Sequence, residues 1–216
     1  MRHYVIGTGS TGNAVLLEDR VMVDIGLPWS RIEPHADKLQ LVLATHRHSD
    51  HWNPATVRAL HRARPGVRFG CCEWMLPLAY AAGLPEWCVD LYQLDTPYTY
   101  GDITVMAQET PHNVRNCCYH IQIGAQRCLY ATDCSSLGHV SAKGYDLLAI
   151  EANHGQEEIQ ERIRQKQAAG VYAYEVEAAR NHLSEEQAMD WIAANAEYGK
   201  TSYVLLHRHV ERELEV

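Results

Sequence analysis

Four residues that commonly bind metal ions lie within six positions of one another in the stretch THRHSDHW. They are His46, His48, Asp50 and His51. Alternate residues of an extended chain face the same way, so His46 and His48 can converge on one point. Asp50 and His51 follow the bend and can face a second point close by. Imidazole and carboxylate are the usual ligands of zinc, manganese and iron. The spacing therefore predicts a metal site, and a solvated histidine-rich loop is the alternative.

The segments on either side of this cluster indicate how the fold presents it. Residues 41–44 form a continuous apolar run, which predicts a buried strand that ends at the cluster. Residues 54–64 begin with proline and carry apolar side chains at helical spacing, which predicts a helix directly after it. The cluster is thus expected on a loop between a buried strand and a helix.

Further strands and helices are predicted along the rest of the chain. Apolar segments bounded by turn residues predict strands at residues 4–6, 14–18, 20–24, 67–71, 103–108, 118–123, 127–132, 147–151 and 203–207. Helices are predicted at residues 156–169 and 185–197, the second with a capping box between Ser184 and Gln187. Many early strands, interspersed helices and more helix late in the chain indicate two sheets with helices outside.

The bulk composition indicates one domain of ordinary globular type. The chain has 216 residues and a formal net charge of −8, which argues against a broad basic surface for nucleic acid. Its beginning lacks the pattern of a secretion signal and no apolar run is long enough to span a membrane, so a cytoplasmic protein without membrane partners is expected. The seven cysteines are odd in number and include two adjacent pairs, which predicts reduced, mostly buried thiols.

The H-x-H-x-D-H pattern after an apolar strand resembles the metallo-β-lactamase-fold hydrolases. Other motifs agree in order along the chain: VMVDIG with Asp24, TPHNV with His112, LYATDC with Asp133 and NHLS with His182. The resemblance implies an α/β fold, the four-layer αββα sandwich of that family, as a single domain over residues 1–216.

With aspartate at position 133, the chain resembles the nuclease and phosphodiesterase branches of the family. The true β-lactamases of the fold carry cysteine at this position. The motifs GTGSTGN, EANH and NHLS look most like the YycJ (WalJ) group, which is related to RNase Z and PhnP. Two positions depart from that group. Asn181 stands where glycine is usual, and Asn113 stands where aspartate is expected.

The resemblance implies a two-metal centre with seven ligands. One ion takes His46, His48 and His112, the second takes Asp50, His51 and His182, and Asp133 bridges them. Zinc is the first expectation and manganese the second. Two ions about 3.5–4 Å apart can activate a hydroxide that attacks a phosphodiester in line. Asp50 is assigned to catalysis as well as to the metal.

Several residues outside the ligand set are candidates for supporting roles. Asp24 is expected to orient the ligand loop through hydrogen bonds. Glu151 and His154 are expected in catalysis, with His154 as general acid or substrate ligand and Glu151 holding a histidine in one tautomer. A helix-capping loop with a surface histidine is the alternative. His207 and His209 either contact substrate phosphate or are solvated.

The family branch favours a nuclease that acts on the ends of DNA or RNA. The alternative is a small-molecule phosphodiesterase, for example one acting on cyclic nucleotides, which the acidic charge favours. A metal-binding protein without catalysis is the third class, although structural zinc rarely needs seven ligands. The basic run of Arg58, His61, Arg62, Arg64 and Arg68 could guide a polyanion, but a solvated helix face is the commoner explanation. A homodimer is left open.

Overall fold

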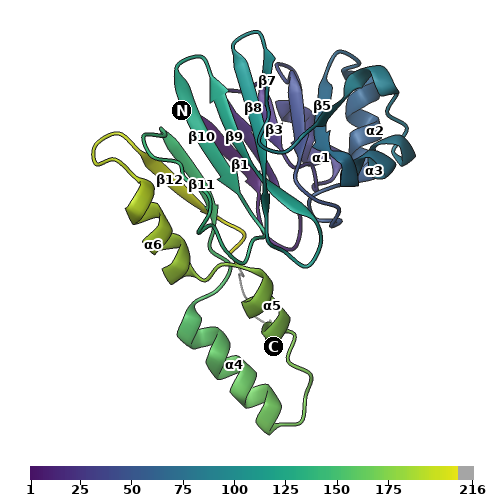
Figure 1. The fold of residues 1–216 in the computed structure, drawn as a ribbon. Helices are drawn as coiled ribbons and strands as arrows, with labels where there is room; N and C mark the ends of the chain where they lie inside the picture. Colours follow the sequence, from purple (N-terminus) through teal and green to yellow (C-terminus); the bar gives the residue numbers. More distant parts are fainter. Residues whose placement is uncertain (209–216) are drawn as a thin grey trace.

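Two six-stranded mixed sheets pack face to face in the computed structural model, which describes residues 1–208 (Figure 1). The first sheet has the order β1 (His3–Gly7), β2 (Ala14–Leu17), β3 (Val21–Val23), β4 (Leu41–Ala44), β5 (Arg68–Cys72) and β6 (Val89–Tyr92). The second has the order β12 (Ser202–Leu206), β11 (Leu147–Glu151), β10 (Gln126–Ala131), β9 (Asn116–Ile123), β8 (Ile103–Thr110) and β7 (Pro97–Tyr100).

Helices cover the outer face of each sheet. The first sheet is covered by α1 (Trp29–Ile32), α2 (Pro54–Ala63) and α3 (Leu76–Ala81), whose buried side chains share a core with its outward-facing residues. The second is covered by α6 (Glu185–Asn195), packed on β10 and β11. Short 3₁₀ helices occur at Glu33–His35, Glu73–Met75 and Glu86–Cys88. The layers are therefore helix, sheet, sheet, helix, as the sequence predicts.

Strand β4 shows why its sequence is uniformly apolar. It pairs in parallel with β3 and β5, so it lies inside the first sheet. Leu41 and Leu43 point into the core between the sheets, whereas Val42 and Ala44 pack under the helices. Both faces of the strand are buried, which excludes the polar alternation of a half-exposed strand. This rigid strand delivers the chain directly into the histidine cluster.

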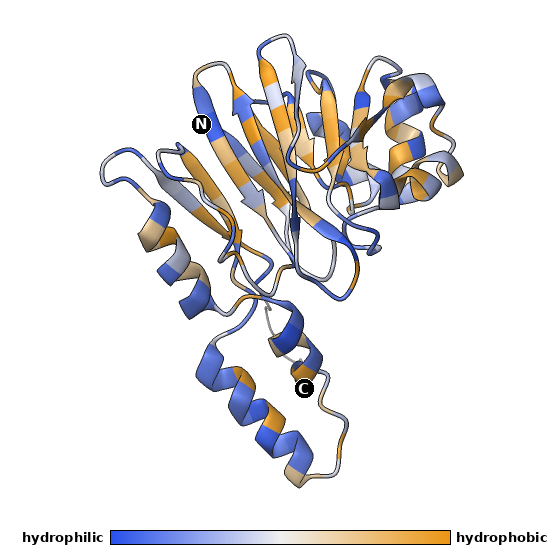
Figure 2. Cartoon of the chain, in the orientation of Figure 1, coloured by the Kyte–Doolittle hydropathy of each residue, from blue (hydrophilic) through white to orange (hydrophobic). Residues whose placement is uncertain are grey.

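Helices α4 (Gln156–Ala168) and α5 (Glu175–Asn181) form an arm that projects from one end of the sandwich (Figure 1). Figure 2 shows that α4 is mostly hydrophilic, in contrast to the strands of the sandwich. Its buried residues are Ile159 and Ile163 alone. The arm begins just after Glu151 and ends just before His182, so both of its ends lie beside residues with predicted roles.

Most predicted elements are confirmed, with boundaries shifted by a few residues. The capping box between Ser184 and Gln187 is present, and all seven cysteines are free and buried. The sequence did not predict α1, α3, α5, β6 or β7. These elements have four to seven residues, too few for a clear periodic pattern, and tertiary packing stabilises them. Within residues 1–208, no helix combines the length and the apolar character that crossing a membrane requires.

Candidate metal centre

Loops that follow four strands bring the candidate ligands together at one edge of the sandwich. His46 and His48 follow β4, His112 follows β8, Asp133 follows β10 and His207 follows β12. Strands β10, β11 and β12 are parallel neighbours, as are β3, β4 and β5. Their carboxyl ends therefore meet at the same edge, which is the usual place for a site in such sheets.

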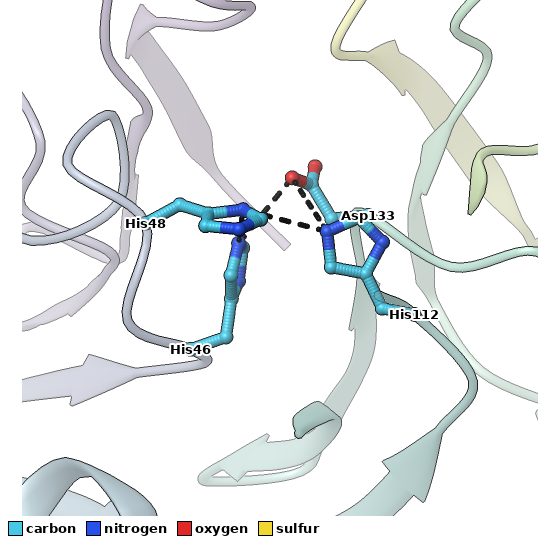
Figure 3. Close-up of side chains that lie close together, drawn as sticks. All are labelled: His46, His48, His112 and Asp133. Carbon is cyan, nitrogen blue, oxygen red and sulfur yellow. Dashed lines mark hydrogen bonds and ion pairs between the residues drawn. The ribbon is translucent and has the colours of Figure 1, made fainter. Parts of the chain in front are cut away.

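The first group of potential ligands consists of His46, His48, His112 and Asp133 (Figure 3). Their ligand atoms all lie within 4.8 Å of one another. The Nε2 atom of His46 lies 3.0 Å from Nδ1 of His48 and 3.4 Å from Oδ2 of Asp133. His112 Nε2 lies 3.4 Å from His48 Nδ1. The residues predicted for the first ion are thus convergent.

The second group consists of Asp50, His51, Asp133 and His207. His51 Nε2 lies 3.4 Å from Asp50 Oδ2 and 3.3 Å from Asp133 Oδ2. His207 Nε2 lies 3.5 Å from Asp50 Oδ2 and 3.4 Å from Asp133 Oδ1. Asp133 therefore belongs to both groups, in the bridging place that the resemblance implies for it.

His182, expected as the last ligand of the second ion, lies outside that group, and His207 takes the place beside Asp50 and His51. His182 is the C-cap of α5, and its Nδ1 contacts Oε1 of the buried Glu151. It shares a third group with Asp133, Glu151 and His207. From the sequence, His207 was expected either to contact substrate phosphate or to be solvated. The order of residues along the chain does not show that the loop after the last strand lies at the cluster.

The hydrogen bonds of His46 fix its proton on Nδ1. The single hydroxyl proton of Thr45 goes to Asp24 Oδ1 at 2.8 Å, so Thr45 Oγ1 accepts from His46 Nδ1 at 3.0 Å. His112 likewise donates from Nδ1 to the carbonyl of Asn181 at 3.1 Å. Both rings then present an unprotonated Nε2 to the centre.

A cation between these two lone pairs would be stabilised by both of them. Burial lowers the pKa of His112 to about 4 and, with His46 nearby, lowers the pKa of His48 as well. Neutral imidazole is the form that binds metal. In addition, Nε2 of His207 is buried without a hydrogen-bond partner among residues 1–208. This donor set fits divalent metal ions of the zinc or manganese type.

Asp24 supports both ligand groups through hydrogen bonds, as expected from the sequence. Its Oδ1 accepts from the backbone and hydroxyl of Thr45, and its Oδ2 accepts from His51 Nδ1 at 2.7 Å. The hydroxyl of Tyr130 donates to the same Oδ2 at 3.2 Å. One buried carboxylate thus orients a histidine of each group.

The glycine-rich loop at residues 7–13 supports the second group, a role the sequence analysis did not assign to particular side chains. The amide of Asn13 donates to the carbonyl of Asp50 at 3.2 Å and lies 2.9 Å from His51 Nε2. Thr8 Oγ1 accepts from the backbone N–H of His207 at 2.6 Å. Gly12, with φ of +136°, allows the tight turn between these contacts. The loop therefore positions ligands that are far apart in sequence.

Three residues of the centre have a strained backbone. Asp24, Asp133 and His207 have φ values of 60°, 52° and 55°, which non-glycine residues adopt at a cost. Burial opposes ionisation of Asp133, yet His51 and His207 hold the pKa of its carboxyl well below the usual value. The surrounding fold thus maintains a charged, strained carboxylate in a buried place, which is typical of functional sites.

The remaining predicted residues lie at the margin of the centre. The backbone of His154 forms an isolated parallel β-bridge with that of Ser184. The Nδ1 atom of His154 lies 3.3 Å from Asn153 Oδ1. Among residues 1–208 it belongs to none of the three ligand groups. His209 lies outside the described residues.

The basic run belongs to α2 and β5, on the far side of the first sheet. Arg68 forms a bidentate salt bridge with Asp90. Arg64 donates to the backbone carbonyls of residues 36 and 37. These contacts favour a structural role over guidance of a polyanion.

Comparison with known proteins agrees with this architecture. The family model of the beta-lactamase superfamily domain matches residues 21–207. The chain belongs to this superfamily. The metallo-beta-lactamase fold protein YhfI from Bacillus subtilis has a similar structure, with a TM-score of 0.70 and 21% identity over 97% of this chain and 86% of that one.

Two further solved structures share the metallo-β-lactamase fold. Human tRNase Z, short form, has a TM-score of 0.68 and 14% identity over 96% of this chain and 93% of that one. A diphosphatase from the PhnP family has a TM-score of 0.65 and 15% identity over 95% and 85%. No curated protein sequence matches this chain. The fold and superfamily predicted from the sequence are confirmed.

Proposed function

We propose that the protein is a dinuclear metal-dependent phosphodiesterase, formed by residues 1–216 as one hydrolase domain. The observation that carries this proposal is the pair of ligand groups that share Asp133. Two ions bridged by one carboxylate suit in-line displacement at phosphorus, because the attacking and leaving oxygens are both stabilised. Among the proteins with this fold are a tRNase and a diphosphatase, whose names both indicate cleavage at phosphorus.

The ligand assignment that we propose differs from the sequence prediction at one residue. One ion would be held by His46, His48 and His112, the other by Asp50, His51 and His207, and both by Asp133. Divalent ions bound there lower the pKa of water and stabilise negative charge on phosphate oxygens. Zinc suits this histidine-rich donor set best, and manganese is the second choice.

His182 is then free for proton transfer, and we propose it as the general acid. Its Nδ1 is held by the carboxylate of Glu151, which is fully buried. Glu151 also accepts from the backbone N–H of Cys134 at 2.8 Å, so its orientation is fixed by the residue after Asp133. A carboxylate on Nδ1 stabilises the imidazolium and leaves Nε2 to protonate the leaving oxygen. The role proposed for Glu151 is thus the one predicted from the sequence, that of holding a histidine in one tautomer, and the histidine is His182.

Asp50 has a second role in this proposal. Its side chain is partly exposed, at 21%, whereas that of Asp133 is 3% exposed. A carboxylate of the centre that also reaches the substrate side can accept a proton from the attacking water. His154 remains a candidate for contact with the substrate, because it lies at the entrance to the arm.

The substrate class that we favour is the end of a DNA or RNA strand, and a small nucleotide is the alternative. The net charge of −8 and the internal contacts of Arg64 and Arg68 disfavour a long nucleic-acid footprint. Cleavage at an end, or of a small phosphodiester, needs contacts to only a few phosphates.

The test is an assay of protein reconstituted with zinc or manganese. Substrates are bis-p-nitrophenyl phosphate, labelled single- and double-stranded oligonucleotides, and cyclic nucleotides, with Asp133→Ala as the inactive control. We expect metal-dependent turnover, with oligonucleotides shortened from one end. Absence of turnover on every substrate, with two ions bound per chain, would refute the proposal. Turnover of cyclic nucleotides alone would select the alternative.

A further inference from the structure

A cavity of about 280 Å³ lies where the arm joins the sandwich. Its wall is formed by the end of β11, by α4 and α5, and by residues beside α6 and β12. The cavity borders the metal centre, because Asn153 lines it and also places its amide 2.9 Å from His207 Nδ1. A ligand in this cavity therefore lies one side chain away from His207 of the second ligand group.

The charges around the cavity disfavour a second phosphate. Glu158, Glu175 and Glu185 all line it. Arg208 lies beside Glu185 at 2.6 Å, and Arg162 lies beside Glu158 at 2.5 Å. The guanidinium charges are thus neutralised locally, and the carboxylate of Glu175 is likewise paired, with Lys166 Nζ at 2.5 Å. An uncharged group is the better occupant.

The shape and chemistry of the wall favour a flat heterocycle. Ile159 and Ala178 supply apolar surface and Tyr174 supplies an aromatic ring, which are the surfaces on which nucleobases stack. The volume is below the range of about 300–1,000 Å³ that is usual for drug-sized ligands, so one base fits and a duplex does not.

We infer that this cavity binds the nucleobase attached to the scissile phosphate. The inference rests on the proposed phosphodiesterase function, and it specifies the substrate as a nucleotide or a strand end with one base held by the arm. Because the arm connects Glu151 and His182, an occupied cavity also contacts the segments that lead to the proposed acid.

Two p-nitrophenyl esters that share a leaving group test the inference. Cytidine 5′-(p-nitrophenyl phosphate) carries a base, and methyl p-nitrophenyl phosphate does not. The variant Ala178→Trp fills the cavity, and Ala179→Trp, one residue on and outside its described wall, is the matched control. We expect Ala178→Trp to lower kcat/KM for the cytidine ester at least about tenfold and to leave the methyl ester within about twofold. Equal losses on both esters would overturn the inference.

Calorimetric binding of free cytidine to metal-free protein separates this inference from the proposed function. We expect Ala178→Trp to bind cytidine at least about tenfold more weakly than wild type, and Ala179→Trp to bind it as wild type does. Equal binding by the three proteins, or none, would overturn the inference even if both esters are hydrolysed. If neither ester is hydrolysed, the proposed function fails, while nucleoside binding still decides whether the cavity holds a base.

Discussion

The edge of the sandwich and the α4–α5 arm are neighbours built in opposite ways. At the edge, strands such as β4 and β11 are buried throughout, and the loops that follow β4 and β10 hold His46, His51 and Asp133 almost without exposure. In the arm, α4 buries two isoleucines among thirteen residues. Metal ligands must be held to within a fraction of an ångström, which a doubly packed sheet can do. The sparsely packed arm is better suited to adjust around a substrate.

Asp133→Ala should have the largest effect of any single change, because its carboxylate belongs to both ligand groups. We expect hydrolysis to fall to background and bound metal to fall below two ions per chain. Turnover and elemental analysis of reconstituted protein measure this, and circular dichroism checks the fold. Asp95→Ala is the matched control: Asp95 is an exposed aspartate with φ of 56°, so it reproduces the backbone strain without the site. Wild-type turnover in Asp133→Ala would contradict the shared-ligand centre.

His182→Ala and His207→Ala should differ in kind. We expect His182→Ala to keep two ions and lose about 10²–10⁴-fold in kcat, the usual contribution of a general acid. The loss should be smaller on p-nitrophenyl esters, whose leaving group needs little protonation. His207→Ala should instead lose one ion, as elemental analysis would show. If His182→Ala loses an ion and His207→Ala keeps both, the ligand assignment reverts to the sequence prediction.

Stability measurements test the contrast in packing directly. Leu43→Ala, in the core between the sheets, should lower the free energy of unfolding by about 2–5 kcal/mol. Ile163→Ala, at 9% exposure in the arm, should lower the free energy of unfolding by less than about 2 kcal/mol. The space left by the removed atoms opens towards solvent, and alanine favours helix. Urea titration of metal-free protein with a common probe provides both values. Equal losses would show that the arm is as tightly coupled as the core.

Asn13→Ala should have the smallest effect of the series. Its side-chain amide donates a hydrogen bond to the backbone carbonyl of Asp50. Loss of such a supporting hydrogen bond usually weakens metal binding by about 10–100-fold. We expect a weaker second ion in a chelator competition and an unchanged first ion. Asn113→Ala, at an exposed asparagine beside His112, serves as the control. An equal weakening of both ions would argue against a local role for the loop at residues 7–13.

The amino-acid sequence by itself determined the superfamily, the layered fold and six of the seven proposed ligands. It could do so because the H-x-H-x-D-H spacing and the apolar run before it are local patterns, and because the motifs around His112 and Asp133 resemble those of the family in the same order. The tertiary structure decided the pairing of His207 with Asp50 and of His182 with Glu151. Both histidines follow short elements near the end of the chain, and only the parallel packing of β12 on β11 brings the first to the centre. The cavity likewise depends on the positions of α4 and α5 relative to the residues that follow β11. No spacing along the chain specifies that arrangement.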